Sequence, residues 1–125
     1  MAVKVGNQTW QLMRPPVILE TATVAGPLEG EGPLRADYDS IYADPVAGES
    51  SFEAAEREMM LNACFTALQK AGLAPSNIDV FLAGDLLNQT ITSGFSAQEL
   101  KIPYLGIYGA CSSSAESLII AAALV

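Results

Sequence analysis

The segment from Tyr104 to Glu116 restricts the fold of this chain more than any other. An apolar stretch that ends at Tyr108 passes through a Gly-Ala pair into Cys111, and three serines follow. This pattern is typical of a buried strand, a tight turn and a helix start. Unpaired N–H groups at a helix start stabilise negative charge. We therefore expect a reactive thiol at this corner, and Cys111 is the first candidate for a functional residue.

The 125-residue chain contains no histidine. Acyl transfer at a cysteine generally needs a base, most often histidine, which takes and returns the thiol proton. Either that base lies in sequence outside this chain, or the pocket at Cys111 binds a ligand without reacting. The sequence favours binding over catalysis and leaves an enzyme open.

Composition bounds the class of protein. Half of the residues are hydrophobic, which is enough for the core of one globular domain. A net charge of −8 would repel a phosphate backbone, so we expect no nucleic acid partner. The amino terminus lacks the apolar core of a secretory signal, and no apolar run is long enough to span a bilayer. Two separated cysteines favour reduced thiols over a disulfide, and we expect no metal ion and no cofactor.

A helix between Ser50 and Gly72 has the strongest signals in the chain. Ser50 with Glu53 fits a capping box, and Gly72 with Pro75 fits a helix end. Cys64 belongs to the apolar stripe, where we interpret it as a small core residue. The stripe repeats at helical spacing and comprises Met60, Ala63, Cys64, Ala67, Leu68 and Ala71.

The remaining segments alternate between strands and helices. We expect a strand over Val17 to Val24, then a long loop over residues 26–48, which is rich in Gly, Pro and Asp. After the helix, we expect a strand over Ile78 to Ala83, a helix over Ser93 to Leu100, and a strand over Lys101 to Tyr108. This order predicts an α/β fold, layered, with a parallel-rich sheet and right-handed crossovers.

The last expected helix has more apolar surface than the rest of this chain can bury. Its residues from Leu118 to Val125 are apolar on every side. A helix of this kind must be enclosed by other protein, so we expect either the amino-terminal portion of a longer protein or cover from another subunit. At its start, Ser113 and Glu116 fit a second capping box, and a general base is the alternative role for Glu116.

Two groups of polar residues have both a functional and a structural interpretation. The hydroxyl groups of Ser112, Ser113 and Ser114 suit a carboxylate ligand at a helix start, but helix capping also accounts for at least one of them. The segment from Asp85 to Gln89 follows a core strand, where α/β proteins place ligand groups, but such residues also form turns.

Motifs spread along the whole chain also carry a family resemblance. They are Gln8-Thr9-Trp10, Thr23 to Pro27 with Glu31 to Leu34, Phe81 to Gln89, and Gly109 to Ser112. On these residues the chain resembles the first half of a thiolase-fold protein, with the cysteine at the start of a buried central helix. More particularly, it resembles the stage V sporulation protein AD family of spore-forming bacteria.

The resemblance implies a function that the thiol alone does not. It implies that residues 1–125 are the amino-terminal part of a thiolase-like domain, in a protein that binds dipicolinic acid for uptake into the developing spore. Such a protein acts with other spore inner-membrane transport proteins, from the cytoplasm or the periphery of that membrane. The ligand site would comprise Cys111, Ser112, Ser113 and Ser114.

The resemblance also implies a homodimer, because the corresponding thiolase loop reaches the two-fold interface. That segment comprises Asp85, Leu86, Leu87, Asn88 and Gln89. The alternative function is a cysteine-dependent acyltransferase or thiolase-type condensing enzyme, with Cys111 as nucleophile and acyl-coenzyme A or an acyl carrier as partner.

Overall fold

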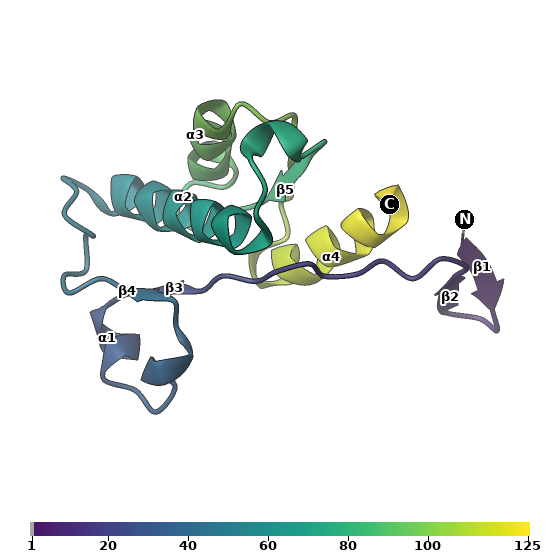
Figure 1. The fold of residues 1–125 in the computed structure, drawn as a ribbon, viewed down its shortest axis with the longest axis horizontal. Helices are drawn as coiled ribbons and strands as arrows, with labels where there is room; N and C mark the ends of the chain where they lie inside the picture. Colours follow the sequence, from purple (N-terminus) through teal and green to yellow (C-terminus); the bar gives the residue numbers. More distant parts are fainter. Residues whose placement is uncertain (1) are drawn as a thin grey trace.

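The computed structural model describes residues 2–125, and Met1, the first residue of the predicted domain, lies outside this part. The chain begins with an antiparallel hairpin, in which β1 (Ala2–Val5) pairs with β2 (Thr9–Leu12) (Figure 1). Gly6 takes a left-handed conformation at the turn, with a φ of 66°. We did not predict this hairpin, although a Gly-Asn pair between apolar positions is a hairpin signal.

The predicted strand over Val17 to Val24 is wrong except at its last residue. Only β3 (Val24–Ala25) is a strand, and the preceding residues form an extended connection from the hairpin (Figure 1). A strand needs a partner for its backbone groups, and within residues 2–125 no other strand pairs with this connection. Its apolar side chains are accordingly exposed, with Ile18 at 69%.

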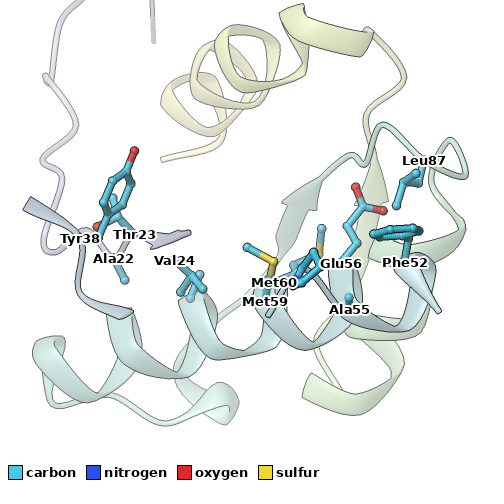
Figure 2. A pocket seen from close by; sticks show the side chains of 12 residues that line it. Ala22, Thr23, Val24, Tyr38, Phe52, Ala55, Glu56, Met59, Met60 and Leu87 are labelled. Carbon is cyan, nitrogen blue, oxygen red and sulfur yellow. The ribbon is translucent and has the colours of Figure 1, made fainter. Parts of the chain in front are cut away.

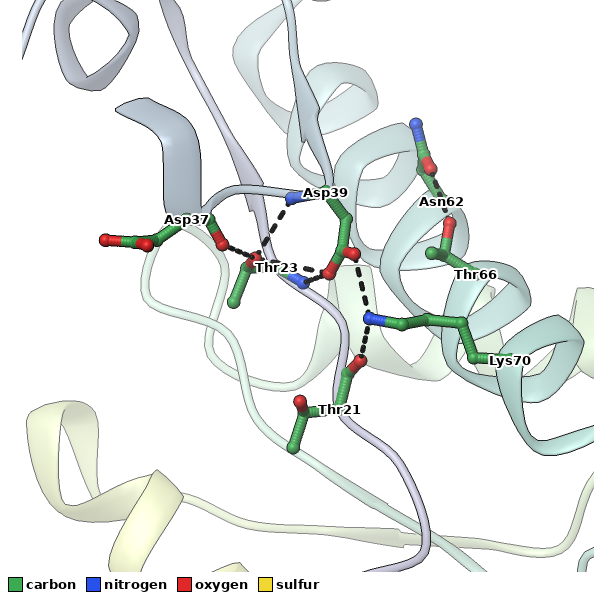
Figure 3. Close-up of polar contacts among 7 residues, drawn as sticks. All are labelled: Thr21, Thr23, Asp37, Asp39, Asn62, Thr66 and Lys70. Carbon is green, nitrogen blue, oxygen red and sulfur yellow. Dashed lines mark hydrogen bonds and ion pairs between the residues drawn. The ribbon is translucent and has the colours of Figure 1, made fainter. Parts of the chain in front are cut away.

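The predicted loop over residues 26–48 contains short elements. They are α1 (Pro27–Gly30), a 3-10 turn at Arg35–Asp37, and β4 (Ser40–Ile41), which pairs in parallel with β3. Asp39 fixes the loop, because its carboxylate accepts hydrogen bonds from the Thr23 backbone at 2.9 Å and from Lys70 Nζ at 2.8 Å (Figure 3). Lys70 also donates to the Thr21 carbonyl at 2.7 Å. The pKa of Asp39 is lowered by the hydrogen bond from Lys70, by the bond from the Thr23 backbone and by the positive charge of Lys70.

The long helix α2 (Phe52–Ala71) confirms the strongest sequence prediction, with its start moved by one residue. The N-cap is Ser51 instead of Ser50, and its hydroxyl accepts from the Ala54 N–H at 3.2 Å. Gly72 ends the helix in a left-handed conformation, with a φ of 67°. The predicted apolar stripe is confirmed only in part, because Cys64 packs in the core whereas Met60 and Ala63 line a surface hollow, and the buried residues of α2 are Ala55 and Leu61.

The core lies where α2 meets the next strand-helix-strand unit. Its buried residues are Leu61, Leu100 and Ile102, with Cys64, Ile78 and Phe81 packed around them. Cys64 is therefore the core residue that the sequence predicts, and burial raises the pKa of its thiol.

The strand-helix-strand unit consists of β5 (Phe81–Ala83), α3 (Ile91–Leu100) and β6 (Tyr104–Gly106), and the two strands are parallel. The predicted order of elements is thus confirmed, but a single parallel sheet is not. The described residues form three separate two-stranded sheets, because no strand among them joins the β3–β4 pair to the β5–β6 pair.

The last helix, α4 (Ser113–Leu124), packs with one side against β5. None of its residues is buried by the rest of residues 2–125, and Ile119 is 69% exposed. Nothing in the part of the chain that the structure describes covers the outer side of α4, so its burial as a central helix by further protein stays a prediction. Within residues 2–125, no helix has the length and apolarity needed to cross a membrane.

Gly72 and Gly94 provide a test of the helix boundaries. A side chain at Gly72 would meet no atom within 4 Å, so Gly72→Ala changes only the left-handed backbone, and we expect a loss of about 1 kcal/mol in unfolding free energy. Gly94 lies inside α3 with room for a methyl group, so Gly94→Ala should be neutral or stabilise by up to about 1 kcal/mol. Urea unfolding of both variants measures the difference, and equal effects would contradict the assigned helix end.

Candidate functional site

The parallel pairing of β5 with β6 brings two predicted site segments to one edge. Ala83 lies opposite Gly106, and the Ile107 N–H donates to the Ala83 carbonyl at 2.9 Å. The chain therefore leaves both strands side by side at their carboxyl ends, where open α/β sheets place ligand groups. From β5 it continues into Asp85 to Gln89, and from β6 into the corner that holds Cys111.

Cys111 stands directly before a helix, as the sequence predicts. It lies in a 3-10 turn, Ala110–Ser112, that leads without a break into α4. Ala110 has a φ of 47°, a left-handed conformation that is uncommon for a residue with a side chain. The Cys111 thiol is free and exposed to solvent.

The serines after Cys111 have different roles. The predicted capping box of Ser113 and Glu116 is wrong, because Ser112 is the N-cap and makes no side-chain bond to the backbone N–H groups of α4. Instead the Ser112 hydroxyl has two acceptors, the Gly109 carbonyl at 2.6 Å and the Glu116 carboxylate. Its single proton can serve one of them at a time. The Ser112 hydroxyl is thus hydrogen-bonded within the corner, and Glu116 is one of its two acceptors.

Ser113 and Ser114 lie beside Cys111 at the mouth of a hollow of about 430 Å³. The Ser113 oxygen accepts a bond from the Gly109 N–H at 3.3 Å, which leaves its own proton free to donate, and Ser114 is exposed. The apolar part of the wall comes from β5 and the residues after it. The hollow is lined by Leu82, Ala83, Gly84, Leu86, Ala110, Cys111, Ser113, Ser114 and Ser117. We call it the Cys111 hollow.

Among the residues of the Cys111 hollow that the sequence analysis did not predict, Ser117 and Gly84 shape the site. Ser117 lies one helical turn after Ser114 and so shares its face, a spacing that was available in the sequence. Gly84 allows α4 to approach β5, because a side chain there would collide with the Ile107 carbonyl and would lie 3.1 Å from the Ser113 oxygen. That close approach depends on tertiary packing, and the sequence alone carries no signal for it.

Asp85 is buried and belongs to a hydrogen-bond network. Its carboxylate accepts bonds from the Ser93 N–H at 2.9 Å, the Ser93 hydroxyl at 2.8 Å and the Asn88 N–H at 3.2 Å. The Ser93 hydroxyl also contacts the Tyr104 hydroxyl at 2.6 Å. The N-cap of α3, Thr90, makes no side-chain bond of its own, so Asp85 caps this helix from a distance.

The other residues of the predicted interface segment point in different directions. Leu86 and Leu87 are exposed apolar side chains, and Gln89 is exposed as well. Leu86 lines the Cys111 hollow, whereas Leu87 lines a separate hollow on α2. Asn88 is half-buried. The segment is therefore held at Asp85 and presents two leucines at the surface, and its role as an interface stays a prediction.

The geometry defines a mixed α/β protein with a free thiol and serine hydroxyls at a helix start, beside the carboxyl ends of two parallel strands. Within residues 2–125, no group of three or more potential ligands is placed to hold a metal ion.

The family model of stage V sporulation protein AD matches residues 6–125, and the chain belongs to that family. A curated relative, Stage V sporulation protein AD of Bacillus subtilis (strain 168), is 45% identical over 120 residues. The match covers 96% of this chain, and the chain spans 36% of the length of that relative.

The buried carboxylate of Asp85 makes stability depend on pH. Burial raises the pKa of Asp85, but hydrogen bonds from Ser93, Thr90 and Asn88 lower it more, and the net pKa is lowered. A lowered pKa in the folded state adds stability above the unfolded value of about 3.9, and this stability is lost as pH falls through the folded pKa.

We therefore expect Asp85→Asn to reduce the unfolding free energy by about 2 kcal/mol at pH 7, since bonds to a charged group are lost. The difference from the native protein should shrink as pH falls below about 4. Asp79→Asn is the matched control, because Asp79 is exposed. Thermal unfolding between pH 7 and pH 2 checks this, and a difference that is independent of pH would contradict the role of the charge.

Proposed function

We propose that the Cys111 hollow binds dipicolinate, as part of a non-catalytic, thiolase-like protein that takes part in uptake of this dianion into the developing spore. The observation that carries the proposal is the pairing of serine hydroxyls with an apolar wall in one hollow. Ser113, Ser114 and Ser117 supply hydroxyls on one side, and Leu82 and Leu86 supply apolar surface on the other.

This arrangement suits an aromatic dicarboxylate. The ring of dipicolinate can lie against the leucines, while its carboxylates accept hydrogen bonds from hydroxyl and N–H groups at the start of α4. The net charge of −8 governs long-range steering and does not prevent local binding of an anion. The absence of histidine from this chain agrees with binding without turnover.

Membership in the family bears on the biological process in which the proposed binding takes place. Membership in the stage V sporulation protein AD family supports a role in sporulation. We propose further that the full-length protein is a homodimer that acts with spore inner-membrane transport proteins, from the cytoplasm or the periphery of that membrane. Exposed Leu86 and Leu87, in the segment held by Asp85, supply apolar surface for the dimer contact.

Calorimetric titration of the full-length protein with dipicolinate tests the binding site. We expect Ser113→Ala to weaken binding about tenfold, because a hydrogen bond to a charged carboxylate is lost, and Cys111→Ala to weaken it less. Ser76→Ala is the matched control, since Ser76 is exposed and does not line the Cys111 hollow. Circular dichroism checks that each variant is folded. Titration without heat, together with no thermal stabilisation by dipicolinate, would refute the proposal.

The exposed thiol of Cys111 favours a second candidate, a cysteine-dependent acyltransferase. In that reaction the sulfur attacks the acyl carbonyl of acyl-coenzyme A, and coenzyme A leaves as the thiol after taking the proton of Cys111. The base would come from outside this chain. Mass spectrometry after exposure to acyl-coenzyme A should then show an acyl group on Cys111 and none on half-buried Cys64, which serves as an internal control. An unmodified Cys111 would rule this candidate out.

A further inference from the structure

A larger hollow, of about 630 Å³, runs along one face of α2 (Figure 2). Its rim is formed by residues 22–24, Tyr38, Pro45 and Leu87. The lining residues of α2 repeat at helical spacing and are Phe52, Ala55, Glu56, Met59, Met60 and Ala63. We call this hollow the α2 groove. Since a helix rises 1.5 Å per residue, the α2 groove is roughly 16 Å long.

The lining of the α2 groove on its helix side is apolar except at one point. Phe52, Met59 and Met60 present a ring and two flexible thioethers (Figure 2). Methionine adapts its shape to a partner and is common at binding surfaces. A continuous stripe at this spacing is the pattern by which a helix receives a polypeptide segment along its length.

Glu56 is the exception, and its carboxylate lacks a full set of partners. One oxygen, Oε1, accepts a long bond of 3.4 Å from the Leu86 N–H. The other, Oε2, is buried from solvent, and the described residues offer it no hydrogen-bond donor. An unpaired buried acceptor costs free energy that a donor would recover.

Phe52 and Leu87 lie beside this carboxylate (Figure 2). Both are surface side chains, 59% and 52% exposed, and they would have to turn aside to admit a donor to the buried Oε2. Arg57, the next residue along α2, lines a different hollow, together with Asn88 and Phe95. The cationic side chain nearest to Glu56 in the sequence, that of Arg57, therefore does not line the α2 groove.

We propose that the α2 groove is a docking site for a polypeptide segment that carries a cationic side chain between apolar ones. The apolar side chains lie against Phe52, Met59 and Met60, and the cation pairs with Oε2 of Glu56. Charge complementarity selects this occupant: the groove offers a carboxylate, and the chain carries a net charge of −8. The proposed dimer contact at residues 85–89 shares only Leu87 with the groove, so a second copy is not expected to fill it, and a small amine would fill little of the groove's length.

A pair of synthetic peptides tests the docking site in the full-length protein. One peptide has arginine between leucines, and the other has citrulline, an uncharged isostere, in place of arginine. The methyl resonances of Met59 and Met60 report occupancy by NMR. We expect both signals to shift with the arginine peptide, and its affinity to exceed that of the citrulline peptide about tenfold.

Two variants test whether the preference for the arginine peptide depends on the Glu56 carboxylate. Glu56→Gln should abolish the difference between the peptides, whereas Glu99→Gln, an equal change of charge at an exposed position on α3, should leave it intact. The contrast between peptides on the native protein keeps the test valid should Glu56→Gln fail to fold.

Four results would overturn the proposal. They are equal binding of the two peptides, no shift with either peptide, a preference that survives Glu56→Gln, and equal binding by hexylamine with the same dependence on Glu56. Sedimentation that shows a dimer dissociated by Met59→Ser, a change inside the groove and outside the proposed dimer segment 85–89, without loss of folding would assign the α2 groove to a second copy, and would also overturn it.

Discussion

The pairing of β5 with β6 is the interaction on which the candidate site depends. Because the strands are parallel and Ala83 lies opposite Gly106, the chain leaves both at the same edge. The Ser93 hydroxyl then links the exit of β5 to the first residue of β6, since it bonds to Asp85 and contacts Tyr104. A buried, hydrogen-bonded carboxylate at this place fixes the loop and the start of α3 together.

The irregular loop before α2 is held by contacts to this helix. The Lys70–Asp39 ion pair connects the end of α2 to the loop, and the Tyr42 hydroxyl bonds to Glu58 and Asn62 in the middle of the same helix. Tyr42 therefore donates to Glu58 at 3.0 Å while it accepts from Asn62 at 3.0 Å. One long helix thus organises both the irregular loop and the strand-helix-strand unit, and the small apolar core includes Leu61 in the middle of this helix.

The sequence predicted those structural features that depend on residues close together in the chain. Residues close in sequence decide three of the predicted features: the left-handed Gly72, the core position of Cys64 and the helix start after Cys111. The strand at Val17 failed because strand formation depends on a distant partner, and residue types alone do not supply one. The cap of α3 was missed for the same reason, since Asp85 reaches Ser93 across eight positions. Sequence reasoning placed Ser112 in the ligand site, but its hydroxyl is occupied by Gly109 and Glu116.

Leu86 connects the two hollows of the molecule. Its side chain lines the Cys111 hollow, while its backbone N–H donates to Glu56 in the α2 groove. The adjacent Leu87 lines the α2 groove itself. The bond from Leu86 to Glu56 is long, and Asp85 on the other side of Leu86 is held firmly by Ser93. A donor that pairs with Glu56 would therefore act on the one backbone segment that both hollows share, directly after the residue, Asp85, that Ser93 holds in place.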